Sequence, residues 1–297
     1  MELYQLRSFI AIAEMGNFTR AAAKLSTTQP TLSQQIINLE KELGHKLFHR
    51  LGRRAVLTET GQIFLNRARR ITLEADNAAK ELRDHPGLDR RITVGAIASV
   101  APYFLPPLIA QARIDYPNLE IHAHEDFRSP LIREVLEGEL DLAIVASPVH
   151  EPALSVEPLI REPLLLVVGP QHRFTQMPKV NAADLAGETF VMLGRSSSLY
   201  DQVRTFCGDH RFEPRIGFRC AQIATVKALV AMGAGIAILP RITQSSKDLD
   251  TLVYLRLADS SPERELVVVR HLQRYQSRGV TQFLTMLKAG VPLRAHH

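Results

Sequence analysis

The chain of 297 residues contains little cysteine and no apolar run of membrane length. Cys207 and Cys220 are its only cysteines, and they form neither a CxxC pair nor a disulfide framework, which is typical of a reducing compartment. The longest apolar stretch, 228–240, is shorter than the roughly 20 residues that a membrane span needs. The first residues also lack the apolar core of a signal peptide. We therefore expect a cytoplasmic protein without a membrane partner.

The motifs of common enzymes and cofactor sites are missing as well. The sequence contains no P-loop, GxSxG or HExxH motif, and the GxG at 233–235 is not extended to GxGxxG. His122 and His124 share one face of an expected strand, beside Glu125 and Asp126, but no third ligand follows at a recognisable spacing. These absences predict a protein that is not an enzyme and that holds no metal and no cofactor.

Positive charge is concentrated in the first quarter of the chain. Residues 1–70 contain eleven Lys or Arg and five Glu, a net charge of +6, whereas the remainder carries 25 basic and 26 acidic side chains. A basic module on a nearly neutral body is typical of a phosphate-binding domain joined to a second part. The alternative is a surface that is basic without a partner.

The basic module has the spacing of three short helices. Apolar residues over 3–13 recur at helical intervals and Gly16 follows them, while Asn17 is placed to cap a second helix. Thr28 is expected to cap a third helix, with Pro30 in its first turn, where the missing N–H costs nothing. Two helices followed by a third at this spacing predict a helix-turn-helix.

The expected third helix has one apolar face and one uncharged polar face. Its buried stripe consists of Leu32, Ile36, Leu39 and Leu43. Hydroxyl and amide side chains on the other face match the donor and acceptor edges of base pairs, whereas a face that is merely solvated more often carries Glu and Lys. The residues that we expect to contact DNA are Thr28, Gln29, Pro30, Thr31, Ser33 and Gln34.

A basic hairpin is expected after this helix. Residues 46–61 alternate and turn at Gly52, which predicts a small β-hairpin, or wing. Its Arg50, Arg53 and Arg54 are placed to lie along a phosphate backbone or to enter a minor groove. The alternative is a solvated hairpin.

The motifs of residues 6–61 occur in a fixed order. They are A-A-x-x-L before the turn, Q-P opening the third helix, S-x-Q-I-x-x-L-E within it, and L-G-x-x-L-F-x-R followed by L-T-x-x-G. In this order and spacing they resemble the N-terminal domain of LysR-type transcriptional regulators. The resemblance implies a regulator that binds double-stranded promoter DNA at an operator and whose DNA binding changes with a small-molecule effector.

A long helix is expected after the wing. Between Thr58 and about His85 there is no interior proline, and apolar residues recur at steps of four and three: Phe64, Ala68, Ile71, Ala75, Ala78 and Leu82. This spacing is typical of two helices packed side by side, and the alternative is one helix packed on its own domain. The resemblance implies a homodimer formed through this linker helix and further assembly into a homotetramer, with RNA polymerase as a further partner to consider.

Strands and helices alternate over the rest of the chain, which predicts an α/β fold with parallel sheet covered by helices. The resemblance implies two lobes of the type 2 periplasmic-binding-protein fold. We therefore expect a winged helix-turn-helix domain over 1–58, a linker helix over 59–88 and an effector domain over 89–297. Lobe I is expected at about 89–161 and 268–297, and lobe II at about 162–267.

Polar residues follow several of the expected strands. Ligands of open α/β sheets bind beyond the carboxyl ends of strands, where helix N-termini offer N–H groups. The candidates for effector binding are Ser99, Val100, Arg128, Ser129, Ser147, Ser196, Ser198 and Gln222. Serines at helix starts together with a guanidinium suit a small anionic or polar effector such as a carboxylate, and the alternative is that these serines only cap helices.

The segment 196–207, SSSLYDQVRTFC, resembles the sensing segment of the peroxide-responsive branch of this family. In that branch a reactive cysteine occupies the place of Ser198, and its partner matches Cys207. A hydroxyl cannot form a sulfenate and then a disulfide. Two interpretations stay open: the protein senses another effector, or it is a peroxide- or redox-responsive regulator in an engineered Cys-to-Ser form.

Overall fold

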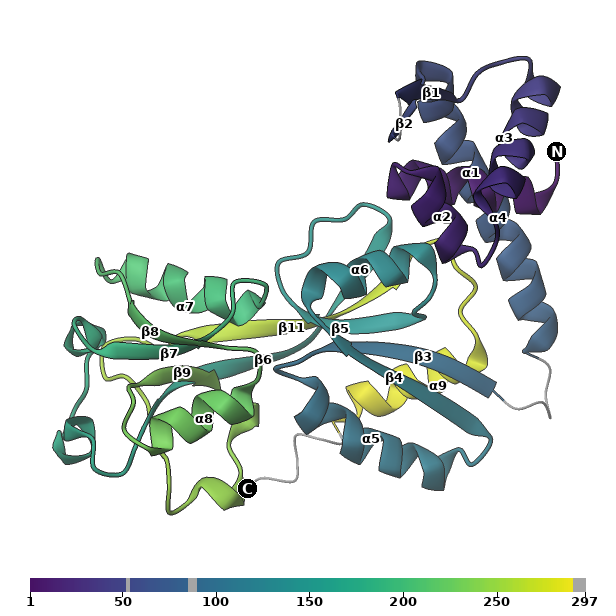
Figure 1. Ribbon diagram of the computed structural model, residues 1–297. Coiled ribbons are helices and arrows are strands. Elements are labelled where there is room, and N and C mark those ends of the chain that lie inside the picture. Colours follow the sequence, from purple (N-terminus) through teal and green to yellow (C-terminus); the bar gives the residue numbers. More distant parts are fainter. Residues whose placement is uncertain (52–53, 85–89, 291–297) are drawn as a thin grey trace. The chain divides into compact units, whose positions relative to one another are not determined.

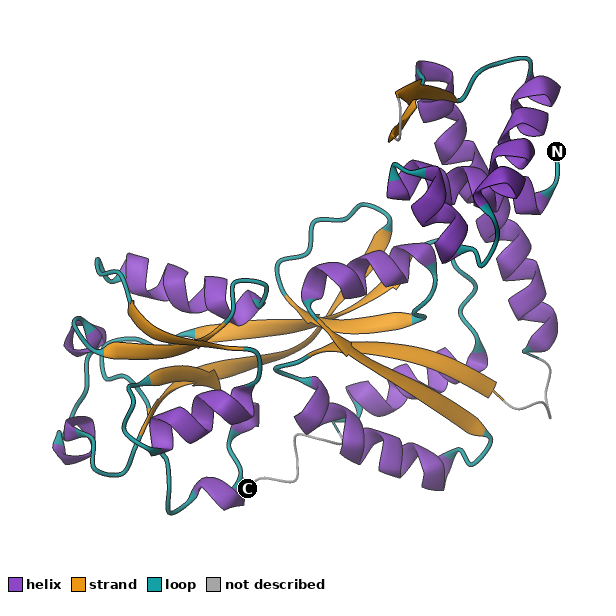
Figure 2. Cartoon of the chain, viewed as in Figure 1, coloured by secondary structure: helices purple, strands orange, loops and turns teal. Residues whose placement is uncertain are grey.

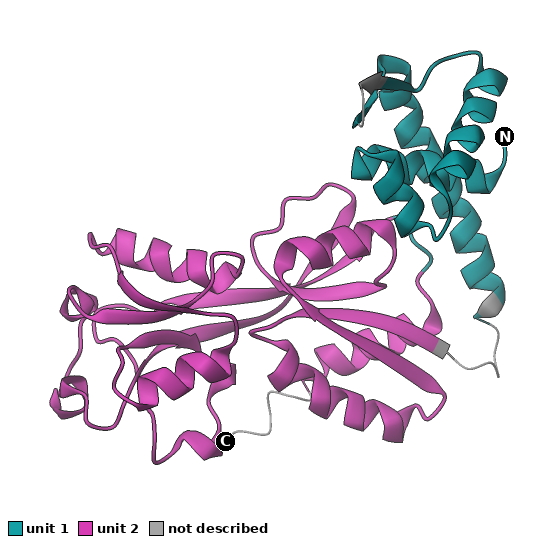
Figure 3. Cartoon of the chain, viewed as in Figure 1, with its two compact units in different colours: residues 1–85, 273–275 teal, residues 86–272, 276–297 magenta. Residues whose placement is uncertain are grey.

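The computed structural model describes residues 1–51, 54–84 and 90–290 (Figure 1). In this part of the chain, helices flank a seven-stranded sheet and two two-stranded sheets (Figure 2). The chain divides into two compact units (Figure 3). One comprises Met1–His85 and Gln273–Tyr275, and the other comprises Pro86–Leu272 and Gln276–His297. Three hydrophobic clusters form the cores, one in the first unit and two in the second.

The first unit begins with three helices whose ends match the predicted caps. They are α1 (Leu3–Met15), α2 (Phe18–Lys24) and α3 (Gln29–Leu43). Gly16 ends α1 in the left-handed conformation, with φ of 60°. The Asn17 side chain accepts a hydrogen bond from the Arg20 N–H at 3.0 Å, and Thr28 Oγ1 accepts one from the Thr31 N–H at 3.3 Å. The predicted helix-turn-helix is confirmed.

The core of this unit is built from the predicted stripe and a group of phenylalanines. Leu32, Ile36 and Leu39 are buried on α3. The ring of Phe9 lies 5.2 Å from those of both Phe48 and Phe64, which joins the start of the wing and the linker helix to α1. Aromatic rings at this separation add about 0.5–1.5 kcal/mol per pair beyond their burial.

The wing is an antiparallel hairpin of β1 (Phe48–Leu51) and β2 (Arg54–Leu57). The buried Glu40 carboxylate accepts hydrogen bonds from the Leu47 and Phe48 N–H groups at 2.9 and 3.3 Å, which joins the wing to α3. A Cβ on Gly61 would lie 2.1 Å from the Leu47 carbonyl oxygen, so only glycine fits the last position of the L-T-x-x-G motif. The predicted turn at Gly52 lies outside the described residues.

The linker helix is α4 (Glu59–Arg83), capped by Thr58. The first part of its seam packs on its own unit, because Ala68 is fully buried and Phe64 contacts Phe9. The later part is open, since Ile71 is 39% exposed and Leu82 is 82% exposed. The first half of the seam therefore packs on its own domain, which was the alternative expectation. The second half is exposed and is available to a partner helix.

The second unit contains two lobes. In the first, β3 (Arg90–Ile97), β4 (Leu119–Asp126) and β5 (Leu142–Ala146) run parallel. One face of this sheet carries α6 (Arg128–Glu137), and the other carries α5 (Ala101–Asp115) and α9 (Arg278–Lys288) (Figure 1). Proline at 106 and 107 is tolerated inside α5.

Two long strands connect this lobe to the second. They are β6 (Leu154–Val168) and β11 (Glu263–His271), and they pair antiparallel. β11 also pairs antiparallel with β5, while β6 pairs antiparallel with β9 (Ala237–Pro240) and β10 (Val253–Leu255). The expected parallel sheet is present in β3–β5. The other pairings of this sheet are antiparallel, because each connecting strand runs back across the unit.

The second lobe contains a separate parallel pair, β7 (Thr189–Leu193) and β8 (Arg215–Cys220). A bridge from Phe190 to Ile236 links it to the end of β9. The helices α7 (Ser198–Asp209) and α8 (Ile223–Ala231) cover this lobe. Its short 3-10 helices are Arg173–Gln176, Ala182–Leu185, Arg241–Thr243 and Ser246–Asp248. Among the described residues, no helix combines the length and apolar character required to cross a bilayer.

Candidate functional site

The polar face of α3 is exposed and internally hydrogen-bonded. Thr28, Gln29, Pro30, Thr31 and Gln34 are exposed, and Ser33 is half-buried. The Gln29 amide donates to Ser33 Oγ at 2.8 Å, and the Gln34 amide donates to Asn38 Oδ1 at 2.9 Å. These contacts between neighbouring turns orient the side chains without burying them. The face can therefore present donors and acceptors to a groove.

The structure describes the three wing arginines to different extents. Arg54 is exposed on β2, where its charge is available to a phosphate. Arg50 lies in β1, but its side chain is outside the described residues. Arg53 lies outside them entirely. Lys46 at the start of the wing pairs with the buried Glu40 at 2.7 Å and is itself exposed.

A small pocket lies in the second unit, where segments from both lobes meet. Its lining comes from the residues that follow β3, β4, β7 and β8, as the rule for open α/β sheets predicts. The lining residues are Ile97, Ala98, Ser99, Phe127, Arg128, Leu193, Ser197, Ser198 and Ala221. Three predicted effector residues, Ser99, Arg128 and Ser198, thus lie around one pocket.

Ser99 is held by a buried ion pair that was not predicted from the sequence. Arg264 Nη1 donates to Ser99 Oγ at 2.7 Å, and Nη2 donates to the Ser99 carbonyl at 3.3 Å. Arg264 is fully buried and pairs with Glu162 at 2.7 Å, so the two connecting strands support the pocket. Burial lowers the pKa of the Arg264 guanidinium, and the Glu162 carboxylate offsets part of that effect. The available signal was a charge at an inward position of the strand ERELVVVRH.

Two helices begin at this pocket. Arg128 is the first residue of α6, and its Nη1 donates to the Pro148 carbonyl at 3.3 Å. Ser198 is the first residue of α7, and Ser197 caps this helix by accepting a hydrogen bond from the Leu199 N–H at 3.3 Å. Helix N-termini favour negative charge. With Arg128, they make the pocket suitable for a small anion.

The other predicted effector residues do not line the pocket. Val100 is buried at the start of α5, and Ser147 donates its N–H to the Glu265 carbonyl at 2.9 Å. Ser129, Ser196 and Gln222 are exposed. The apolar lining residues were not among the predicted candidates, because an apolar residue at a strand end looks like an ordinary core position.

Both cysteines are buried free thiols. Cys207 lies on the inner face of α7, where burial and the nearby Glu213 carboxylate raise its pKa to about 12. Burial also raises the pKa of Cys220, at the end of β8. A thiol with a raised pKa is a poor nucleophile at neutral pH because little thiolate is present.

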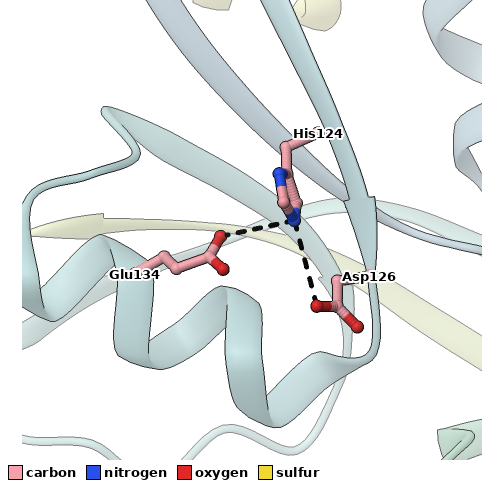
Figure 4. A group of neighbouring side chains, drawn as sticks. All are labelled: His124, Asp126 and Glu134. Carbon is pink, nitrogen blue, oxygen red and sulfur yellow. Dashed lines mark ion pairs between the residues drawn. The ribbon is translucent and has the colours of Figure 1, made fainter. Parts of the chain in front are cut away.

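A cluster with metal-ligand chemistry lies beside the pocket. His124 and Asp126 on β4 meet Glu134 on α6, and their ligand atoms all lie within 4.8 Å of one another (Figure 4). His122 is not part of it and pairs instead with Glu120 at 2.6 Å. Glu134 lies eight positions after Asp126 on a different element, which is why sequence spacing did not reveal it.

Comparison with known proteins finds one family over nearly the whole chain. Residues 3–62 match "Bacterial regulatory helix-turn-helix protein, lysR family", and residues 85–292 match "LysR substrate binding domain". The DNA-binding transcriptional dual regulator OxyR of Escherichia coli K12 is 33% identical over 272 residues, covering 91% of this chain and 89% of that protein. The Hca operon transcriptional activator HcaR of the same organism is 34% identical over 242 residues, covering 81% and 82%. The structure of a full-length OxyR variant from Pseudomonas aeruginosa has a TM-score of 0.70 at 25% identity and covers 99% of this chain and 95% of its own.

Proposed function

Because the chain belongs to the LysR family of DNA-binding transcriptional regulators, we propose that a small anionic molecule in the pocket between its lobes modulates how it binds operator DNA. The observation that carries this proposal is the meeting of Ser99, Arg128 and Ser198 around one pocket. The exposed polar face of α3 reads bases, and the wing holds phosphates.

The chemistry of the pocket suggests the class of effector. A guanidinium can hold a carboxylate through two parallel hydrogen bonds, and the Ser99 and Ser198 hydroxyls can complete the contacts. The effector changes DNA binding only if it binds one arrangement of the lobes better than another.

Assembly and partners form the second part of the proposal. The exposed part of α4, with Ile71 and Leu82, supplies the surface for a homodimer, and further contacts build a homotetramer. Two helix-turn-helix domains in one dimer bind two half-sites, and RNA polymerase is the partner through which the bound regulator affects transcription. Because the protein binds operator DNA, we propose that it is cytoplasmic.

A thermal-shift screen of small carboxylates and other anions on the full chain tests the effector proposal. A molecule that binds the native state alone raises the melting temperature. The proposal requires that a stabilising molecule also changes operator affinity and loses both effects in Arg128→Ala. If stabilising molecules act equally on Arg128→Ala, the pocket is not the effector site.

A second candidate is a peroxide- or redox-responsive regulator, which the similarity to proteins named OxyR favours. The serine at 198 and the buried Cys207 with its raised pKa count against it. Substitution Ser198→Cys tests whether the rest of the chain supports a peroxide response. If Ser198→Cys makes operator binding respond to peroxide through a bond to Cys207, the redox interpretation is favoured; an unchanged response favours a different effector.

A regulatory rather than catalytic role is supported by the relatives, which are named as transcriptional regulators. A turnover assay on effector candidates from the screen tests this directly. Conversion of a bound molecule by the full chain would contradict a purely regulatory role.

A further inference from the structure

We propose that His124, Asp126 and Glu134 form a binding site for a divalent transition-metal ion. The His124 Nε2 atom lies 3.9 Å from Asp126 Oδ2 and 3.7 Å from Glu134 Oε2. In Figure 4 the imidazole lies between the two carboxylates, which come from different elements and point toward it. The three side chains therefore enclose one point in space.

The distances are close to those of a metal site. Nitrogen and oxygen ligands bind zinc at about 2.0–2.2 Å, so neighbouring ligand atoms around a tetrahedral ion lie about 3.4 Å apart. The two separations from His124 exceed this value by a few tenths of an ångström, and the two carboxylates lie within 4.8 Å of each other. Small rotations of the side chains close that difference without moving the backbone.

The charge of the cluster also favours a cation. Two carboxylates lie near each other, and the Glu134 side chain is only 13% exposed, so its charge is poorly solvated. Asp126 is further fixed because its Oδ1 accepts a hydrogen bond from the Phe127 N–H at 2.6 Å. A neutral imidazole with two carboxylates carries two negative charges, which a divalent ion balances.

The donor set indicates the kind of ion. Imidazole nitrogen is a ligand for zinc, nickel, copper and iron, whereas calcium and magnesium prefer oxygen alone. His124 is 48% exposed, so water can complete the coordination on the open side. Three protein ligands and an open position are typical of zinc sites that exchange a ligand.

An ion at this point would join the end of β4 to α6. The residues between its ligands include Phe127 and Arg128, and both line the pocket. A bound ion would therefore restrain the segment that carries Arg128. The proposed metal binding itself does not depend on what occupies the pocket.

The test uses the full chain without an affinity tag, stripped with a chelator and titrated with Zn²⁺ by calorimetry. Co²⁺ absorption in the visible range reports the ligand geometry. We expect zinc to bind the cluster in the unmodified chain and to bind it at least about tenfold more weakly in His124→Ala and in Glu134→Gln, because losing a ligand costs no less than losing its supporting contacts.

The matched control is His122→Ala, which removes a histidine from the same strand but outside the cluster. Binding by the terminal His296 and His297 is common to all variants and cancels in the comparison. Far-UV circular dichroism and the melting temperature without metal establish that each variant is folded. Asp126→Asn replaces Glu134→Gln if the latter does not fold.

Three results would overturn the site. One is zinc affinity that is unchanged in the folded His124→Ala and carboxylate variants. Another is an equal loss in His122→Ala, which would mean that zinc binds elsewhere on the strand. The third is an unmodified chain that binds no zinc, which would show that the cluster is an ion pair alone.

Discussion

The DNA-facing side of α3 and the pocket of the second unit are built in opposite ways. The α3 side chains come from one stretch, 28–34, and hydrogen-bond one another while exposed. The pocket takes its lining from four separate segments, and its Ser99 is held by the buried Arg264–Glu162 pair. Replacing an exposed polar group changes stability little, whereas a buried charge that loses its partner costs several kcal/mol. Substitutions should therefore affect binding alone on α3, and stability as well as binding in the pocket.

The largest expected effect comes from breaking the support of the pocket. Arg264→Ala leaves the Glu162 carboxylate buried without its cation, and the free energy of unfolding should fall by about 3–5 kcal/mol. Ser99 also loses its donor, so the affinity for any pocket ligand should fall. Urea denaturation followed by circular dichroism measures the change in stability.

The matched control is Arg161→Ala on the same pair of strands. Arg161 pairs with Glu265 at 3.1 Å, but its side chain is 74% exposed. Its loss should cost about 0–1 kcal/mol. Equal losses in the two variants would mean that burial does not distinguish these pairs.

For Arg128→Ala we expect a smaller loss of stability but a large loss of the response of operator binding to effector. Arg128 is half-buried and contacts the Pro148 carbonyl, so its removal leaves no unpaired buried charge. The response of operator binding to effector should be lost, while binding without effector stays as it was. Arg128→Lys should not restore the response, because an ammonium cannot form two parallel hydrogen bonds. Electrophoretic mobility shifts with and without effector measure both quantities.

On the α3 side, Gln34→Ala should change base preference without changing stability. A direct amide contact to a base contributes about 1–3 kcal/mol of discrimination. Affinity for the operator should therefore fall while affinity for random DNA is kept, as measured by fluorescence anisotropy. Equal losses on both DNAs would count against α3 as the recognition helix.

Arg54→Ala provides the contrast on the wing. Loss of a phosphate contact should weaken binding to all sequences and reduce the slope of log K against log salt by about one. A salt dependence equal to that of the unmodified chain would place Arg54 away from the backbone.

The last effect concerns Cys207 and is absent at neutral pH, because it appears only as the pH rises above 9. Its pKa is about 12 in the folded chain against an ordinary 9.0, because burial disfavours the thiolate. The unfolded chain therefore releases this proton first, and stability present below pH 9 is lost as the pH rises toward 12. Cys207→Ala should flatten this part of the stability profile.

At neutral pH, peroxide should leave operator binding unchanged, and a Cys207–Cys220 disulfide that altered DNA binding would contradict this expectation.

The features that the sequence predicted well depend on residues close together in the chain. The caps Asn17 and Thr28, and Gly16 at the end of α1, act within one turn, and the stripe of α3 follows from helical spacing alone. Three of the eight effector candidates named from the strand-end rule, Ser99, Arg128 and Ser198, lie around one pocket, and their part in effector binding stays a prediction.

By itself, then, the sequence determined the helix-turn-helix, the linker helix and the alternation of strands and helices, since each depends on spacing within a few turns. Only the tertiary structure decided which half of α4 is buried, that Glu134 meets His124, and that Arg264 pairs with Glu162 across 102 positions. Such contacts depend on how β6 and β11 are registered and how helices pack on the sheet. Local spacing does not encode that register, because it is set by the fit of the whole core.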